Sequence, residues 1–383
     1  MCGIYIHIPF CKKACYYCNF HFSTSQKYKE AYINALLKEI ILKKDIFKQN
    51  IKNASSPQKI NTIYFGGGTP SQLSVRFIDQ IIDTLYKNYP IASAIEFTIE
   101  ANPDDLNNEN LKAYYNFGIN RLSIGIQSFN AVDLVYLNRT HNAAMAEYSI
   151  MRAQDKGFSN INIDLIYGIP TLTPKSWHKN LNKFLSLNIP HLSSYCLTVE
   201  PKTPLEVLIK KHKLIPVNEA KSIKHFNILT KYMKNNGFLH YEISNFCKEN
   251  YYSKHNISYW QQKPYLGFGA SAHSYNGDTR SWNIANTTQY IKDINNDILF
   301  SESEKLSPVT KYNEYILTSL RTMWGCDLGY IMKIFGNIFH SYASEQLTIY
   351  KQKRYVTEKD NIIYLTEKGK LFADKIASDL FIV

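Results

Sequence analysis

The sequence lacks a long hydrophobic run and a recognisable leader. No stretch of about 18 consecutive apolar residues occurs in the 383 residues, so no membrane-spanning helix is expected. The opening residues, MCGIYIHIPFC, contain neither a basic segment nor a cleavable apolar one. They therefore predict no secretory or transit signal, and we expect a cytoplasmic protein. Long low-complexity segments and internal repeats are lacking as well.

Cysteine is sparse and odd in number, which argues against a disulfide scaffold. The chain has seven cysteines, and in a long sequence without an export signal such a count is typical of reduced thiols or metal ligands. Three of them, Cys11, Cys15 and Cys18, fall close together near the N-terminus. This clustering indicates metal binding.

The charge is basic, but the lysines are dispersed. A net charge of +12 is compatible with nucleic acid, an anionic membrane or an anionic ligand, whereas scattered lysines more often form a solvated surface. Lys351, Lys353, Arg354 and Lys359 near the C-terminus could contact phosphates. We favour a domain that covers the mouth of a barrel for this region, and we expect no nucleic-acid partner.

Short apolar runs alternate with helical patterns over the first 200 residues. The runs interpreted as strands are 3–8, 61–65, 95–100, 121–127, 161–167 and 192–199. Helices are expected at 28–44, at 74–88 and in a segment that ends at Gly118. This alternation predicts parallel crossover units, and six of them predict an α/β fold, an open (β/α)6 partial TIM barrel. In such barrels the chemistry lies on loops after the strands.

The rest of the chain is expected to form two further regions. We predict a core barrel at 1–235, an extension at 236–305 and a C-terminal domain at 306–383. The C-terminal pattern is three helices, a hairpin at Asp360 and Asn361, and a final helix. It predicts a small α+β domain of the winged-helix type.

Cys11, Cys15 and Cys18 follow the first strand with x3-x2 spacing. Iron–sulfur clusters use thiolate ligands, and four usually close a cubane, so three would leave one iron open. Zinc is the alternative, with His21 as a fourth ligand. Tyr17, before the last cysteine, and the spacing itself favour the radical S-adenosylmethionine (SAM) type of cluster.

Polar residues recur at the ends of the later strands. Gly66–Pro70 follows the second strand, where missing side chains let the backbone approach a ligand closely. Glu100 ends the third strand, Gln127 the fourth, and Asp164 lies in the fifth. Each of these polar residues alone is more often structural, but together they are expected to converge on one rim of the barrel. This convergence disfavours zinc.

These motifs resemble the radical SAM family that contains oxygen-independent coproporphyrinogen III oxidases and the heme chaperones related to them. The resemblance rests on Tyr5–Cys11, the cysteine triplet, GGGTP, Glu100-x-Asn102-Pro103, GxQSF and DLIYG. It implies a [4Fe-4S] cluster on the three cysteines, whose open iron takes the amino and carboxylate groups of SAM, and one-electron reduction of SAM to a 5′-deoxyadenosyl radical. The implied SAM contacts are Tyr5, Tyr17, Gly67, Gly68, Thr69, Glu100, Gln127, Arg139 and Asp164.

Two departures from the oxidase pattern point to the chaperone branch. Phe20 stands where the oxidases have a further cysteine, and Cys11 lies almost at the start of the sequence. The branch's HNxxYW motif is present as His255, Asn256, Tyr259 and Trp260. The resemblance implies that these residues bind heme, and imidazole is a common axial ligand for heme iron. The alternative is that His255 makes only structural hydrogen bonds.

The resemblance leads to two functional hypotheses. The first is a heme chaperone that binds heme, a [4Fe-4S] cluster and SAM and delivers heme to respiratory acceptor proteins. This hypothesis implies a protein that donates electrons to the cluster, and it allows a homodimer. It implies contact with a membrane only through the heme-accepting proteins. The second is oxidative decarboxylation of coproporphyrinogen III in porphyrin biosynthesis. Whether SAM is cleaved productively stays open.

Overall fold

A twelve-stranded sheet organises the larger part of the described chain. The computed structural model describes residues 2–45, 59–299 and 302–383. Within them the strand order is β12-β11-β10-β9-β1-β2-β3-β4-β5-β6-β8-β7. The central strands are β1 (Cys2–Ile8), β2 (Ile60–Gly67), β3 (Ile91–Ala101), β4 (Arg121–Gln127), β5 (Asn160–Tyr167) and β6 (His191–Cys196). Each is parallel to the next, which confirms the six predicted strands and the open α/β barrel.

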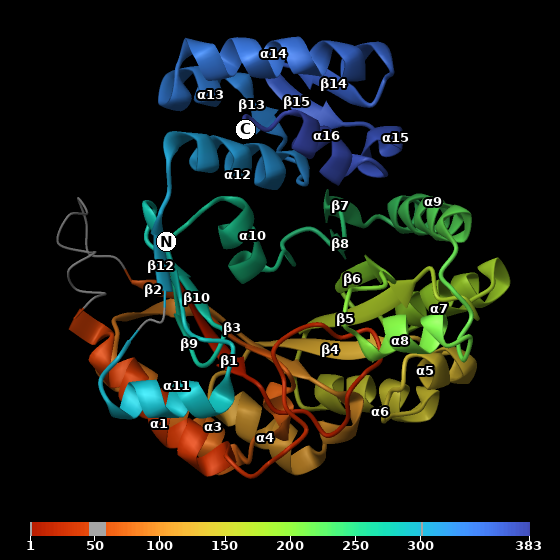
Figure 1. Ribbon diagram of the computed structural model, residues 1–383. Coiled ribbons are helices and arrows are strands. Elements are labelled where there is room, and N and C mark those ends of the chain that lie inside the picture. The colour runs from red at the N-terminus through yellow and green to blue at the C-terminus, as the bar shows by residue number, and fades with distance from the viewer. Residues whose placement is uncertain (1, 46–58, 300–301) are drawn as a thin grey trace.

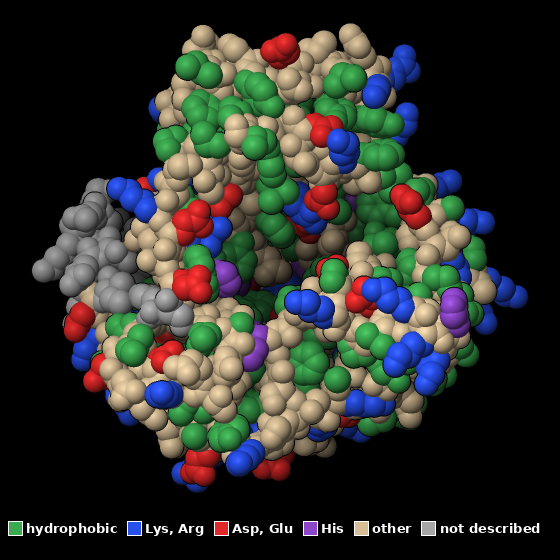
Figure 2. All heavy atoms as spheres, in the orientation of Figure 1, with side chains coloured by type: hydrophobic (Ala, Val, Ile, Leu, Met, Phe, Trp, Pro, Cys, Tyr) green, Lys and Arg blue, Asp and Glu red, His purple; other side chains and the backbone are tan. Residues whose placement is uncertain are grey.

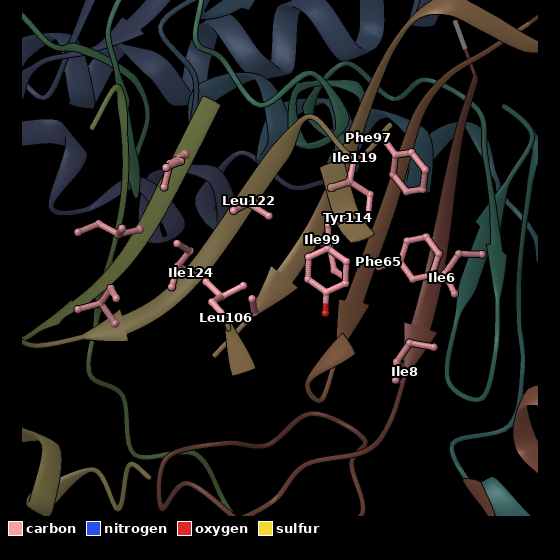
Figure 3. Close-up of a cluster of buried hydrophobic side chains, with 14 of the residues drawn as sticks. Ile6, Ile8, Phe65, Phe97, Ile99, Leu106, Tyr114, Ile119, Leu122 and Ile124 are labelled. Atoms are coloured by element: carbon pink, nitrogen blue, oxygen red, sulfur yellow. The ribbon is translucent and has the colours of Figure 1, made fainter. Parts of the chain in front are cut away.

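Helices cover the outer face of the curved sheet (Figure 1). They are α1 (Lys29–Leu42), α3 (Val75–Asn88), α4 (Asn108–Asn116), α5 (Ala131–Tyr136), α6 (Ala143–Asp155), α7 (Pro174–Ser186), α8 (Pro204–Lys210) and α9 (Glu219–Asn235). Figure 3 shows Ile6, Phe65 and Ile99 from neighbouring strands in one buried cluster with Tyr114 of α4. Parallel strands are covered by their crossover helices, which explains why they appear in the sequence as continuous apolar runs.

Shorter strands extend both edges of the barrel sheet. They are β7 (Leu239–Glu242), β8 (Asn245–Cys247), β9 (Tyr265–Phe268), β10 (His273–Tyr275), β11 (Thr279–Trp282) and β12 (Glu302–Lys305). Of these, β9 runs parallel to β1, whereas β10, β11 and β12 continue antiparallel. The short α10 (Lys254–Trp260) precedes β9, and α11 (Thr287–Asn295) packs against α1. No strand was expected from the sequence in the regions of β8, β9, β10, β11 and β12.

The C-terminal elements have a hydrophobic core of their own and lie across the open side of the barrel (Figure 1). They comprise α12 (Pro308–Leu320), β13 (Cys326–Asp327), α13 (Leu328–Phe335), α14 (Asn337–Gln352), β14 (Val356–Lys359), β15 (Ile362–Leu365), α15 (Glu367–Lys370) and α16 (Ala373–Asp379). Asp360 and Asn361 both have positive φ, as the two central residues of a type I′ hairpin do. The predicted order of helices and hairpin is confirmed, while the domain boundaries stay predictions.

No helix among residues 2–45, 59–299 and 302–383 has the length and apolar character needed to cross a bilayer. Lys351 of α14 pairs with Glu358 of β14, which neutralises one of the basic residues near the C-terminal hairpin.

Candidate functional site

A cavity of about 460 Å³ opens at the carboxyl ends of the parallel strands. Its walls come from the loop after β1 and from the ends of β2 to β6. The predicted site residues that line it are Cys11, Cys15, Tyr17, Cys18, Gly67, Gly68, Thr69, Glu100, Gln127, Arg139 and Asp164. The space-filling view is hollowed at its centre, between the barrel and the C-terminal elements (Figure 2). The predicted convergence on one rim is therefore present in the structure.

The three cysteines of the loop are free thiols around this cavity. Thr69 Oγ1 donates a hydrogen bond to Cys11 Sγ (3.3 Å), and Arg139 Nη1 donates one to Cys15 Sγ (3.2 Å). Burial raises the pKa of Cys11 to about 11, although the bond from Thr69 opposes this rise. Both donors would stabilise thiolates, which are the ligands that an iron–sulfur cluster needs.

The arrangement does not suit a single zinc ion. Among the described residues, no group of three His, Cys, Asp or Glu side chains is close enough to hold one metal ion. His21, the proposed fourth zinc ligand, does not line the cavity, and its Nε2 lies 3.2 Å from Thr287 Oγ1. Three thiols spread around a roomy cavity fit the larger cube of a [4Fe-4S] cluster better.

The glycines at the end of β2 and directly after it are required by close packing. A Cβ on Gly68 would lie 3.0 Å from Cys11 Sγ, and one on Gly66 would lie 2.9 Å from the ring of Tyr5. Gly67 has a φ of +115°, and its amide donates to Glu100 Oε2 (3.2 Å). A side chain at Gly68 would therefore displace the cysteine loop, and one at Gly66 would press against Tyr5.

Arg139 joins the cysteine loop to two strands. Its Nη2 donates to Asn102 Oδ1 (2.6 Å) and to the carbonyl oxygen of Gly125 (2.8 Å), while Nη1 reaches Cys15. Its Nε is buried without a hydrogen-bond partner among the described residues. Gln127, at the end of β4, has a φ of +65°, and such strained positions cluster at functional sites. These features suit a polar ligand.

Two acidic side chains face the cavity, Glu100 from the end of β3 and Asp164 from β5, with β4 between the two strands. Burial raises the pKa of Glu100 to about 7, and the hydrogen bond that Tyr64 donates to its Oε1 (2.8 Å) acts in the opposite direction. Burial likewise raises the pKa of Asp164 to about 6, opposed by a bond from Asn162 Nδ2 (2.9 Å). A cationic ligand would compensate the cost of ionising both groups.

Tyr5 is the predicted SAM residue that the structure leaves outside the cavity lining. Its hydroxyl lies 3.1 Å from His7 Nδ1, and its ring stacks on Tyr64 with centroids 6.2 Å apart. Tyr5 therefore supports the wall behind Glu100. Sequence reasoning also missed lining residues, namely Phe22, Asn102, Tyr195 and Glu200. Asn102 stands in the quoted Glu100-x-Asn102 motif, which was a usable signal.

The four residues of the HNxxYW motif lie on α10, outside this cavity. His255 is only 1% exposed, and its Nδ1 and Nε2 lie 2.8 Å from Thr62 Oγ1 and Tyr259 Oη. Its ring stacks on Tyr64 at 5.0 Å, and burial lowers its pKa to about 3. With both nitrogens occupied, this imidazole does not fit an axial ligand in the present arrangement. Trp260 lines a second cavity instead.

The comparisons with known proteins agree with this geometry. Residues 5–184 match the model of the radical SAM superfamily. Over its full length, the chain resembles coproporphyrinogen III oxidase (HemN) from Escherichia coli, with a TM-score of 0.84 and 22% identity, covering 99% of this chain and 89% of the other. At this identity the likeness concerns the fold. The chain therefore carries a radical SAM domain over residues 5–184, with the matching fold.

Proteins of similar sequence identify the family within the radical SAM proteins. The chain is 34% identical to "Heme chaperone HemW" from Bacillus subtilis (strain 168), covering 98% of both chains. It is 33% identical to the protein of the same name from Lactococcus lactis subsp. lactis, over 95% of this chain and 93% of the other. The chain belongs to the HemW family of radical SAM proteins.

Proposed function

We propose that this protein is a heme chaperone that binds heme, a [4Fe-4S] cluster and SAM and delivers heme to acceptor proteins. The observation that carries the proposal is full-length similarity to HemW proteins, together with a cavity in which three thiols meet polar strand ends. In this proposal the protein works in the cytoplasm and receives electrons for its cluster from a donor protein. In this proposal the protein also forms a homodimer, and the proteins that accept its heme are respiratory proteins.

Cys11, Cys15 and Cys18 would hold the cluster. When bound, such a cluster supplies an open iron and one electron to SAM. Gly67, Gly68 and Thr69 would admit the ligand beside the cysteine loop, and Glu100 and Asp164 would face its cationic groups. Gln127 and Arg139 would offer hydrogen bonds, with Tyr17 as an aromatic contact.

Coproporphyrinogen oxidation is the weaker alternative. Phe20, which stands where the oxidases have a further cysteine, lies at the cavity and is 69% exposed, so that position offers no thiol. Heme binding through the HNxxYW segment stays a prediction. For His255 to bind iron, its imidazole would first have to leave Thr62 and Tyr259.

Anaerobic reconstitution tests the proposal. We expect about four irons per chain in the unsubstituted protein. We also expect an electron paramagnetic resonance signal that changes on adding SAM, heme binding, and heme transfer to an apo-acceptor. Replacement of Cys11, Cys15 and Cys18 by Ala should remove the iron, while Cys326→Ala, in the C-terminal core, should keep it. Protoporphyrinogen formed from coproporphyrinogen III, or a cluster insensitive to SAM, would refute the proposal.

A further inference from the structure

The loop that carries the three cysteines is hydrogen-bonded to two helices of the barrel, α5 and α8. The amide of Tyr16 donates to the carbonyl oxygen of Leu137, directly after α5 (3.3 Å), and the carbonyl oxygen of Tyr16 accepts from the amide of Leu205 in α8 (2.8 Å). Asn138 Nδ2, one residue further on, donates to the carbonyl oxygen of Ala14 (2.7 Å). Because Tyr16 is the neighbour of a cluster cysteine in the chain, α8 lies close to the proposed cluster.

Exposed lysines gather around this loop and around α8. Residues 210–213, at the end of α8, are Lys-Lys-His-Lys, and all four are exposed. The space-filling view shows Lys and Arg side chains in the region of α8 (Figure 2). Lys210 pairs with Glu206 one turn earlier. The exposed lysines of this region that form no ion pair with any residue of the described ranges are Lys13, Lys202, Lys211 and Lys213.

Exposed aliphatic side chains accompany these lysines. Val132 and Val135 lie one turn apart on α5 and are 58% and 77% exposed. Val207 of α8 and Ile215, which follows α8, are exposed as well. The phenol of Tyr136 donates to the carbonyl oxygen of Ile215 (2.7 Å), so α5 and the segment after α8 are neighbours. Apolar groups rimmed by polar ones mark protein–protein contacts. The four aliphatic residues and the four unpaired lysines form the α5–α8 surface.

The charge and the position of the α5–α8 surface suit an acidic electron-transfer protein. Its acidic neighbours do not cancel the lysines, because Glu206 is paired with Lys210 and Glu200 lines the cofactor cavity. A basic surface steers an acidic partner and raises the rate of association. Electron-transfer complexes have small interfaces, for which a few exposed aliphatic groups suffice. The hydrogen bond from α8 to Tyr16 places this surface beside the cluster loop, which favours an electron donor over a heme acceptor.

We propose that the α5–α8 surface docks an acidic one-electron donor protein, with a flavin or an iron–sulfur centre, beside the cluster loop. In the docked complex the reduced donor loses one electron and the cluster gains it, and no bond forms or breaks. The proposal rests on the proposed function, because it requires the cluster on Cys11, Cys15 and Cys18. It adds the place at which the donor binds and the charge that the donor carries.

The test uses the full-length protein with its reconstituted cluster, and the probe is a reduced flavodoxin, an acidic protein with a bound flavin. Anaerobic stopped-flow absorbance measures the second-order rate constant of cluster reduction. The double variant Lys211→Glu, Lys213→Glu should lower this constant about tenfold at low salt, and the difference should vanish near about 0.5 M salt, because salt screens the charges. Val135→Ser should lower it about threefold at both salt concentrations, because it removes an apolar contact.

The double variant Lys353→Glu, Lys359→Glu is the matched control. It changes the net charge by the same amount, but these exposed lysines lie at the end of α14 and on β14, among the C-terminal elements. Its rate constant should stay within about twofold of that of the unsubstituted protein. Dithionite, which needs no docking surface, should reduce the cluster of every variant to the same extent, which checks that the loop and its cluster are intact.

The outcomes separate the docking surface from the proposed function. Equal rate constants for Lys211→Glu, Lys213→Glu and for the control, or no reduction of the unsubstituted protein by flavodoxin, would overturn the docking proposal. Slower heme transfer or lost binding of a DNA duplex in Lys211→Glu, Lys213→Glu, with unchanged cluster reduction, would assign the surface to another partner and overturn it too. A protein that holds no cluster after reconstitution would instead refute the proposed function.

Discussion

Replacement of Tyr64 by Phe should change how the binding of SAM depends on pH. The Tyr64 phenol donates to Glu100 Oε1 (2.8 Å), and this bond holds the pKa of Glu100 below the value that burial alone would give. Phenylalanine keeps the ring that stacks on His255 and removes only the hydroxyl. The substitution therefore isolates a single hydrogen bond.

The size of the effect follows from the charge of the acceptor. A hydrogen bond to a charged group contributes about 1.5–3 kcal/mol, which corresponds to a rise of about 1–2 units in the pKa of Glu100. The pKa of Glu100 is about 7 before the substitution, so the carboxylate fraction at neutral pH would fall. If the carboxylate is the form that binds cationic SAM, affinity at pH 7 should drop about 5- to 50-fold and recover as pH rises.

This effect can be measured by isothermal titration of the anaerobic, cluster-loaded protein with SAM between pH 6 and 9. This range of about three units covers the expected shift in the pKa of Glu100. Tyr136→Phe is the control, because this buried phenol donates to the backbone carbonyl of Ile215 on another part of the barrel. Nearby Asp164 and Arg121 also act on Glu100, and they are unchanged in both variants. An unchanged midpoint, or one displaced to lower pH, would refute the reasoning.

Three further outcomes are expected. Gly68→Ala should lower the iron content after reconstitution, because its Cβ would lie 3.0 Å from Cys11 Sγ, and iron analysis measures this loss. Glu39→Gln should cost about 3–5 kcal/mol in urea unfolding, because Glu39 is the buried carboxylate partner of Lys43. Finally, the contribution of Glu100 to the stability of the ligand-free protein should fall by about 2.5 kcal/mol between pH 4.5 and 7, because folding raises the pKa of Glu100 and the native state retains its proton there. Glu100→Gln should flatten this pH profile in thermal melts.

The sequence predicted the elements whose signals are local. The six parallel strands appear as apolar runs, because both of their faces are covered, and Glu100, Gln127 and Asp164 could be placed at one rim from the strand order alone. The packing of Tyr5 in the wall of the cofactor cavity could not be predicted from the sequence. It depends on stacking against Tyr64 from the neighbouring strand, which the spacing of a motif does not contain.

The contacts of His255 could not be predicted from the sequence for the same reason, and here the contacting residues lie even further apart in the chain. Its hydrogen bond to Thr62 joins residues 193 positions apart, so no local pattern reveals it. The added strands β9 to β12 were missed for a related reason. They are only three or four residues long, and the parallel pairing of β9 with β1 is decided by tertiary contacts.

The position of α10 gives the residues of the HNxxYW motif structural roles in addition to a role in ligand binding. Its N-terminal end carries His255, which stacks on Tyr64, and Tyr64 in turn bonds Glu100 at the cofactor cavity. Its C-terminal end carries Trp260, which lines the cavity beside the C-terminal elements. The helix α10 therefore joins the wall of the cofactor cavity, through Tyr64 and Glu100, to the cavity beside the C-terminal elements.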